Sequence, residues 1–444
     1  MTGEGMQRRR MLAGALGAAV TLPVAACAAA GPGAAAPGGT VRNVRDFGAI
    51  GDGTADDTAA IAAACRTGDE PLVLYLPAGT YRVTRWPELS DFATIYGDGG
   101  DATTILCETD TTLISLRHRQ RVRFARLGIY LTGPSATAVS LFQCFRCSFD
   151  SVVIRGNHLS DNFPRYAAQR GVVLEGNTGG TAFLNCDINN FGFGLVTSCI
   201  QNYVTSSKFT NNRIGVLGTG NDHNAGLALT NVEFVSDNDP RTTDKHLWVD
   251  GASNDWWLTN VWFEGSDIAL SIGQAGGAGG PSQFGMVNCK VAARSVCLDL
   301  IHCRQPYLAN VRFDPDPHST PIELRIDAAG CPEGTAINLI SSAAADIAAG
   351  VFPPGWQVIG RGSANVPAVQ GTLIAQATGD ADVFRAQAPD GAPMSAILSS
   401  GAWFSDRADG GVVLKDPEGG YWRLVVSPSG ALTTAPLGKQ RPTR

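Results

Sequence analysis

The sequence predicts an all-β fold whose core is built from repeated strands and turns. Glycine accounts for 53 of the 444 residues and stands at the ends of short Val, Ile, Leu and Phe runs, where turns between strands need positive φ. A six-residue unit with asparagine in third place also recurs through the middle of the chain. Only 17% of the residues are charged and 44% are hydrophobic, which excludes a wholly disordered chain.

The first residues carry an export pattern. Arg8–Arg10 precede an Ala-rich apolar stretch that ends at Cys27, and this segment resembles a bacterial twin-arginine signal ending in a lipobox. We therefore expect residues 1–27 to direct export, with Cys27 as lipid acceptor and the lipid as the protein's contact with a membrane. The alternative is ordinary cleavage near Cys27 without a lipid. Residues 28–40, rich in Ala, Gly and Pro, read as a tether. The protein is expected in the cell envelope, lipid-anchored or secreted.

Charge and cysteine content narrow the function classes. Loss of residues 1–26 would remove three arginines and one glutamate, taking the formal charge from −6 to −8, and this balance argues against a nucleic-acid partner. The ten cysteines after Cys27 have irregular spacing. Cys144 and Cys147 form a lone C-x-x-C, so we predict no zinc site and interpret most cysteines as small buried residues.

The folded region is expected to begin near Val41. Residues 41–61 predict a strand, a Gly-rich turn and a helix over 55–66, N-capped by Thr54 with Asp57 reaching back to free backbone N–H groups. This stretch, with Leu76–Tyr81 and Ile95–Gly99, resembles the N-terminal signature of the pectate-lyase superfamily, which includes rhamnogalacturonase and epimerase-like secreted proteins. The resemblance implies a single-stranded right-handed parallel β-helix with an N-terminal capping helix.

Two adjacent acids in the signature, Asp56 and Asp57, invite interpretation as a catalytic carboxylate pair. We interpret them as structural, because acidic residues stabilise a helix N-terminus. Complete catalytic motifs of the polygalacturonase and pectate-lyase relatives are absent from this sequence. Asn212–Gly215 and Arg304–Ala309 match them only in part. The resemblance thus implies the scaffold more strongly than the chemistry.

The repeated unit reads apolar, any residue, Asn, apolar, any residue, apolar. Looser copies have Arg126, Ser151 or Ser206 at the asparagine position, and steps between copies range from 21 to 34 residues, which predicts a constant coil with loops of variable length over residues 41–360. We interpret the repeated Asn as a turn residue that bonds to its neighbours rather than as a ligand-binding column. The clearest copies are Phe183–Ile188, Leu229–Phe234, Leu258–Phe263, Met286–Val291 and Leu308–Phe313.

The position two residues after each Asn faces solvent by period-2 alternation, so successive coils should stack these side chains in one column. Trp262, with Trp256 or Trp257, would offer sugar rings a flat platform, while the Lys and Arg side chains would meet carboxylates. From the point where charges begin, the column reads Asp187, Lys208, Glu233, Trp262, Lys290 and Arg312.

Two mechanisms fit this column. In a hydrolase, Asp187 and Glu233 would be acid and base, two coils or about 9.6 Å apart, near the upper end of the roughly 6.5–9.5 Å of inverting enzymes. In a lyase, acidic groups would hold Ca²⁺ against a uronate carboxylate, while Lys208 or Arg213 takes the proton alpha to it. The same residues also fit an ordinary surface charge ladder.

Two other regions could contribute. His223, in a polar loop between coils, is a candidate acid or base, although a solvated histidine is the alternative. His158 with Asp161, and residues 237–239, lie in longer insertions that could wall a groove. Residues 366–444 read as short strands joined by hairpin turns, which could cap the coils or form an accessory module.

The combined reading is a polysaccharide lyase or glycoside hydrolase acting on a pectin-like or other uronate-containing glycan. The alternative is a non-catalytic glycan-binding β-helix, comparable to an adhesin or spike. The sequence leaves the sugar and the oligomeric state open.

Overall fold

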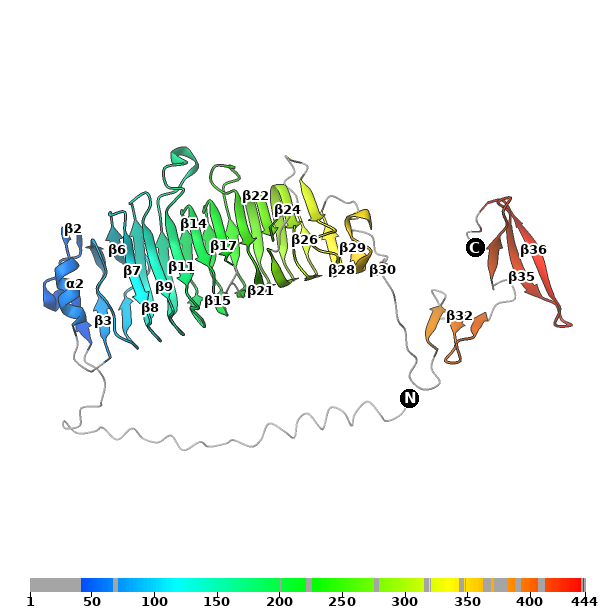
Figure 1. The fold of residues 1–444 in the computed structure, drawn as a ribbon, viewed down its shortest axis with the longest axis horizontal. Helices are drawn as coiled ribbons and strands as arrows, with labels where there is room; N and C mark the ends of the chain where they lie inside the picture. The colour runs from blue at the N-terminus through cyan, green and yellow to red at the C-terminus, as the bar shows by residue number, and fades with distance from the viewer. Residues whose placement is uncertain are drawn as a thin grey trace, which may run out of the picture.

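The computed structural model describes residues 41–66, 71–199, 201–220, 226–274, 279–314, 319, 321–342, 347, 349–361, 369–370, 382–387, 393–405, 412–440 and 442. The signal predicted at residues 1–27, the tether at 28–40, Cys27 and His223 lie outside the described residues. Strands β1–β30 form one continuous 30-stranded sheet that winds into a long solenoid (Figure 1). The predicted parallel β-helix is therefore confirmed.

Each coil places strands in up to three columns, and within a column every strand except β30 pairs in parallel with the one before it. The first column ends with β30 (Val369–Gln370), which pairs antiparallel with β29. Its parallel members are β1 (Arg42–Asn43), β3 (Val73–Leu76), β5 (Thr94–Gly97), β8 (Arg123–Leu131), β10 (Ser148–Arg155), β12 (Ala182–Leu184), β15 (Asn202–Thr205), β18 (Leu227–Thr230), β21 (Ser253–Thr259), β23 (Pro281–Val287), β25 (Gln305–Ala309), β28 (Glu333–Ser341) and β29 (Gly355–Arg361).

Long strands turn a corner and serve a second column. The second column contains parts of β8, β10 and β28 together with β2 (Asp52–Asp56), β4 (Gly79–Arg82), β6 (Thr103–Cys107), β13 (Asp187–Asn189), β16 (Lys208–Thr210), β19 (Glu233–Val235), β22 (Trp262–Ile272), β24 (Lys290–Leu300) and β26 (Arg312–Phe313). The third column contains the later parts of β22 and β24 with β7 (Thr112–Arg117), β9 (Thr137–Phe142), β11 (Arg170–Glu175), β14 (Phe193–Thr197), β17 (Ile214–Thr219), β20 (Lys245–Asp250) and β27 (Ile322–Ile326).

The space between the three columns is filled by inward side chains that repeat from coil to coil. Alternation along each strand sends every second residue inward, and parallel register places like residues above one another. Aromatic rings stack as a result, with centroids 4.7–5.3 Å apart, and such pairs add about 0.5–1.5 kcal/mol each beyond their burial. The stacks are Phe124–Phe149–Phe183 in the first column and Phe209–Phe234–Phe263 in the second.

The N-terminal end of the solenoid is covered by helix α2 (Thr58–Cys65), which follows the short 3-10 helix η1 (Val44–Phe47) and β2. The capping helix is confirmed, but the predicted N-cap at Thr54 is wrong, because residues 52–56 form a strand. Asp57 is the N-cap residue, yet its buried carboxylate accepts the N–H groups of Ile50 and Gly51, at 2.6 and 3.1 Å, so it holds the Gly-rich turn and makes no side-chain bond to the helix.

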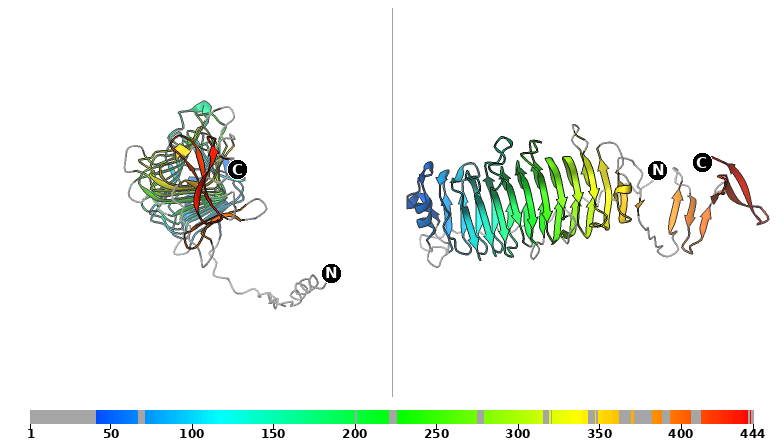
Figure 2. Two further views of the ribbon diagram at one scale, coloured as in Figure 1. Left: turned by 90° about the vertical axis from the view of Figure 1, so that its right-hand side faces the viewer. Right: turned by 45° about the horizontal axis from the view of Figure 1, so that its top comes forward.

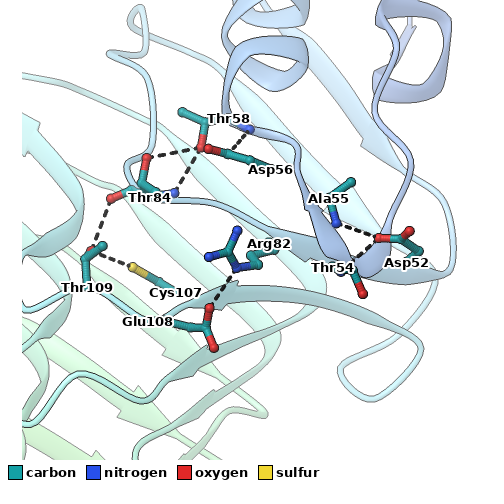
Figure 3. Close-up of polar contacts among 10 residues, drawn as sticks. All are labelled: Asp52, Thr54, Ala55, Asp56, Thr58, Arg82, Thr84, Cys107, Glu108 and Thr109. Atoms are coloured by element: carbon teal, nitrogen blue, oxygen red, sulfur yellow. Dashed lines mark hydrogen bonds and ion pairs between the residues drawn. The ribbon is translucent and has the colours of Figure 1, made fainter.

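The other acid of the pair, Asp56, accepts the Thr58 N–H at 3.0 Å (Figure 3). In the same region, the Thr84 N–H donates to the Thr58 hydroxyl, and Arg82 pairs with Glu108 at 2.7 Å. These contacts confirm the structural interpretation of Asp56 and Asp57 and attach the cap to the first coils.

The repeated asparagine lies at the corner between the first and second columns, in a left-handed backbone conformation. All the predicted positions have positive φ, from 50° to 57°, and Asn338, which the sequence pattern missed, has φ 52°. The side-chain amide of Asn260 donates to Asn231 at 3.1 Å, Asn310 donates to Asn288 at 3.1 Å, and Asn338 to Asn310 at 2.8 Å. The turn-and-ladder interpretation is confirmed.

The cysteines support the core rather than cross-linking it. The ten cysteines of the described residues are free thiols, and all but the half-buried Cys65 are buried. Cys186 and Cys289 occupy the inward position after the repeated Asn, as expected, and burial raises the pKa of their thiols to about 12 and about 11. Thiols with such pKa values stay protonated and unreactive at neutral pH.

Two three-stranded antiparallel sheets follow in the C-terminal part. Hairpins with turns at residues 416–420 and 427–431 confirm the short strands and hairpin turns predicted for this segment. The sheets are β31 (Phe384–Gln387), β32 (Pro393–Ile397) and β33 (Trp403–Ser405), then β34 (Val413–Lys415), β35 (Tyr421–Val426) and β36 (Leu432–Gly438). Across the described residues, no helix combines the length and hydropathy needed to span a bilayer.

The asparagine corner predicts a specific stability pattern. Replacing Asn260 with Ala should lower the free energy of unfolding by about 1–2 kcal/mol more than replacing it with Gly, because Ala pays the left-handed backbone cost and Gly does not. Both variants lose the same ladder hydrogen bonds, so their difference isolates the backbone. Denaturant unfolding followed by circular dichroism measures it, and equal destabilisation of the two variants would contradict the prediction.

Candidate functional site

The candidate residues predicted at the position two after the repeated Asn do stack one above the next on the second column. Strand register pairs Asp187 with Lys208, then Glu233, Trp262, Lys290 and Arg312. We call these six residues the charged row. Neighbouring strands lie about 4.8 Å apart, so the row runs roughly 24 Å along the solenoid.

The N-terminal half of the charged row, Asp187, Lys208 and Glu233, contains an ion pair and a partly buried acid. Lys208 lies 3.3 Å from the Glu233 carboxylate, and both side chains are nearly half exposed, so the pair adds at most about 1 kcal/mol to stability. Burial raises the pKa of the Asp187 carboxyl above its ordinary value, and the positive charges of Lys208 and Arg155 only partly oppose this. Asp187 is thus the member of the row suited to hold a proton.

The C-terminal half of the charged row, Trp262, Lys290 and Arg312, combines an aromatic ring with two cations. The Trp262 ring is 45% exposed, and the Lys290 ammonium lies 4.9 Å from its centroid. Lys290 also pairs with Asp314 at 3.1 Å, while Arg312 on the next coil is exposed. A hydrogen bond from the Ser342 side chain, and to a smaller extent one from Lys290, holds the pKa of Asp314 below its ordinary value. The Asp314 carboxylate therefore stays charged at neutral pH.

The tryptophans proposed beside Trp262 lie elsewhere. Trp256 is fully buried, with its indole N–H donating to the Ser253 hydroxyl at 3.0 Å, so it belongs to the core. Trp257 is 43% exposed but faces outward from the first column, across the asparagine corner from Trp262. The predicted two-tryptophan platform is therefore wrong, because the turn at Asn260 places the two rings on different faces.

Arg213 does not join Lys208. It follows β16 at the junction of the second and third columns, where its guanidinium lies 4.7 Å from the Phe163 ring centroid and donates to the Pro240 carbonyl at 2.6 Å. A further contact to Asp244 measures 3.8 Å. These bonds make Arg213 a connector between two inserted loops rather than a base on the charged row.

Those two loops, residues 156–169 and 236–244, meet in the structure although they are far apart in sequence. The first contains the 3-10 helix η2 (Ser160–Asn162), which projects from the upper edge of the solenoid in Figures 1 and 2. The buried His158 ring bonds to the Thr242 carbonyl at 2.8 Å, and burial lowers the pKa of His158 below its ordinary value. His158 is consequently neutral at pH 7 and fastens the loops together.

A second polar cluster beside the loops escaped sequence reasoning. Lys245 pairs with Asp244 at 3.1 Å and lies 5.1 Å from the half-buried Trp248 ring on β20. These residues stand at the start of the third column, outside the repeated unit. The long steps of the repeat, which mark insertions, were the signal that could have drawn attention to this edge.

No group of three or more His, Cys, Asp and Glu side chains that could hold a metal ion occurs in the part of the chain that the structure describes. The acidic residues of the charged row are instead separated by Lys208 and face it. The side chains present thus do not fit the Ca²⁺ site that the lyase mechanism invoked, and we derive no step through a metal.

Residues 41–223 match the family model described as rhamnogalacturonase A/epimerase, pectate lyase-like. The resemblance predicted from the signature is confirmed. Mannuronan C5-epimerase AlgE3 of Azotobacter vinelandii is 55% identical over 53 residues, 12% of this chain and 3% of the relative. A non-secreted LysM effector of Penicillium expansum is 31% identical over 187 residues, 34% of this chain and 14% of the relative. The chain thus spans a small fraction of these curated relatives.

Solved structures with parallels to this chain include the A-module of an Azotobacter vinelandii mannuronan C-5 epimerase, at 15% identity and TM-score 0.40, covering 67% of this chain and 93% of that one. The PfbA surface adhesin of Streptococcus pneumoniae has 11% identity and TM-score 0.43, covering 68% and 87%. The Dettilon tailspike protein has 14% identity and TM-score 0.44, covering 72% and 68%. At these values the likenesses say nothing about the chemistry of this chain.

The raised pKa of Asp187 predicts a pH-dependent effect on stability. An acid whose pKa is raised on folding destabilises the protein when ionised, and this penalty disappears as the pH falls through the folded pKa toward the ordinary value of 3.8. Replacing Asp187 with Asn should therefore raise the thermal midpoint at pH 7 and leave it nearly unchanged at about pH 3.5. Calorimetry at both pH values tests this. A variant less stable than wild type at pH 7 would contradict it.

Proposed function

We propose that the protein binds an acidic polysaccharide laid lengthwise along the charged row. The observation that carries this proposal is the in-register stack of Trp262, Lys290 and Arg312, which sets an exposed ring and two cations on consecutive coils. An extended pyranose chain advances by a distance similar to one coil for each sugar, so successive sugars would meet successive side chains.

The chemistry of the row suits uronate sugars. Lys and Arg bind carboxylates through charge-assisted hydrogen bonds, and an aromatic face packs against the apolar C–H face of a sugar ring. The chain's formal charge of −6 opposes a polyanion at long range, so attraction must come from a local group of cations. Lys208, Lys290 and Arg312 are the cations of the row, and Arg312 is the exposed one at its end. The names of the matched family and of the epimerase relatives support the same substrate class.

Catalysis on the bound glycan is a second candidate function, favoured by Asp187. A half-buried carboxyl with a raised pKa is suited to general acid catalysis, as a hydrolase requires. Glu233, two coils away, would be its partner base. The Lys208–Glu233 ion pair counts against Lys208 as a lyase base, because the Lys208 ammonium already contacts the Glu233 carboxylate at 3.3 Å. The geometry thus favours hydrolase over lyase roles for these residues.

Binding is tested with the purified protein and polygalacturonate or alginate in affinity electrophoresis at two salt concentrations. Replacing Lys290 and Arg312 together with Ala should weaken binding about tenfold or more and flatten its salt dependence, since both charges face the ligand. Arg82→Ala, at an ion pair near the N-terminal cap, is the matched control and should bind like wild type. The proposal would be overturned if neither polysaccharide slowed the migration of the wild-type protein.

The catalytic candidate is tested in the same incubations by following new reducing ends and the absorbance of unsaturated products. Reducing ends without unsaturation, lost on replacement of Asp187 with Asn, are expected of a hydrolase. Unsaturated products would instead indicate a lyase, and binding with neither product would leave the non-catalytic glycan-binding role. Activity retained in both Asp187→Ala and Glu233→Ala variants would exclude these two residues as the acid and base.

We also propose that the protein is exported and held in the cell envelope by a lipid on Cys27, on the strength of the twin-arginine and lipobox pattern. Replacing Cys27 with Ala should move the protein from the membrane fraction to the soluble fraction, because the lipid would be its anchor. Fractionation and immunoblotting measure the shift. An unchanged distribution of the variant would contradict lipid anchoring.

A further inference from the structure

The first column carries an outward row of aromatic side chains that belongs to neither the core nor the charged row. Tyr203, Trp257 and Tyr307 are 46%, 43% and 37% exposed, and we call them the aromatic row. Strand pairing places Ala228 between the first two and Gly285 between the last two. Aromatic and small residues therefore alternate from Tyr203 to Tyr307, and Tyr203 and Trp257 are each followed by a position with little or no side chain.

Gly285 shows how the largest ring is arranged. A Cβ atom at Gly285 would come within 2.3 Å of two carbon atoms of the Trp257 six-membered ring. The indole therefore leans along the column and covers the glycine on the next coil instead of standing out from the sheet. Any larger residue at position 285 would displace it. The Trp257 indole thus lies against the sheet at Gly285, and this packing fixes its position while the residue stays 43% exposed.

The rows on either side of the aromatic row are mostly polar and carry little charge. Toward the start of the strands lie Asp255, Gln283 and Gln305 in register. Toward the asparagine corner lie Thr230, Thr259 and Val287. Of these flanking positions Asp255 alone is charged, in contrast to the charged row on the next face. Amide and hydroxyl groups beside exposed rings can hydrogen-bond a neutral polar ligand but offer a polyanion no counter-charge.

We propose that the aromatic row binds an extended, neutral β-1,4-linked glycan chain that runs parallel to the solenoid axis. The rings recur every second coil, or about every 9.6 Å. This distance corresponds to two sugars of an extended β-1,4-linked chain, in which every second sugar presents the same face. Sugars of one face would stack on Tyr203, Trp257 and Tyr307, while the flanking amide and hydroxyl groups bind ring hydroxyls.

This site is separate from the acidic-glycan site of the proposed function. The two rows lie on adjacent faces of the solenoid, separated by the asparagine corner at Asn260. The aromatic row would attach the protein to a neutral glycan, and the charged row would engage an acidic one. The two sites can be tested independently, because no residue belongs to both.

The experiment titrates the purified protein with cello-oligosaccharides of two to six sugars, followed by calorimetry. Affinity should rise with chain length until all three rings are occupied, which takes about five sugars at the ring spacing. Trp257→Ala should bind the hexamer about tenfold or more weakly, whereas Trp257→Phe should retain most of the affinity because it keeps a flat ring. Trp262→Ala, a similarly exposed tryptophan on the next face, is the matched control and should bind the hexamer like wild type.

Several outcomes would overturn the proposal. Wild-type protein that does not bind the hexamer, or a Trp257→Ala variant that binds it normally with an unchanged thermal midpoint, would do so. Sedimentation showing a dimer that Trp257→Ala dissociates would assign the row to contact with a second copy of the chain instead. Polygalacturonate binding distinguishes the two proposals. If only the aromatic-row proposal fails, wild-type protein still binds polygalacturonate but not the hexamer. If only the proposed function fails, wild-type protein binds the hexamer but not polygalacturonate.

Discussion

The left-handed turn residue between the first and second columns is the constraint on which the solenoid depends. It lets the chain turn sharply at the same point of successive coils, so the strands on either side keep one register. A one-residue slip would exchange the inward and outward side chains of a strand. The phenylalanine stacks, the charged row and the aromatic row all rely on that register. Asn suits the position because it tolerates positive φ and its amide bonds to the Asn of a neighbouring coil.

Local pattern was enough to predict this part of the structure. The spacing from Asn185 to Asn310 gave the corner positions, and alternation then gave the facing of Lys208 and Glu233, because both follow from the geometry of a single strand. Asn338 was missed because Ser341 stands where the repeated unit requires its last apolar residue. The helix cap was misplaced because residues 52–56 form a strand that pairs with β4, and the Gly-rich turn binds the Asp57 carboxylate; capping rules include neither tertiary contact.

The contacts that sequence reasoning missed join segments distant along the chain. Arg213 binds Phe163 and Pro240, which lie fifty and twenty-seven positions away from it, in two separate insertions. Insertions do not follow the period of the coil, so their positions cannot be obtained by aligning repeats. The separation of Trp257 from Trp262 has a simpler cause, since five residues of sequence include the corner itself. What the protein binds is therefore decided by which face each side chain occupies, more than by its distance along the sequence.

The buried thiols have a consequence for how the solenoid can be studied. Cys107, Cys186, Cys289 and Cys331 are spread along its length, each with no more than 2% exposure, and none is tied in a disulfide. The described coils are therefore held together by packing and hydrogen bonds rather than by disulfide cross-links at these positions. A thiol-specific reagent would label each cysteine only when the coil around it opens. The order of labelling would report which end of the solenoid unravels first, without introducing any foreign probe.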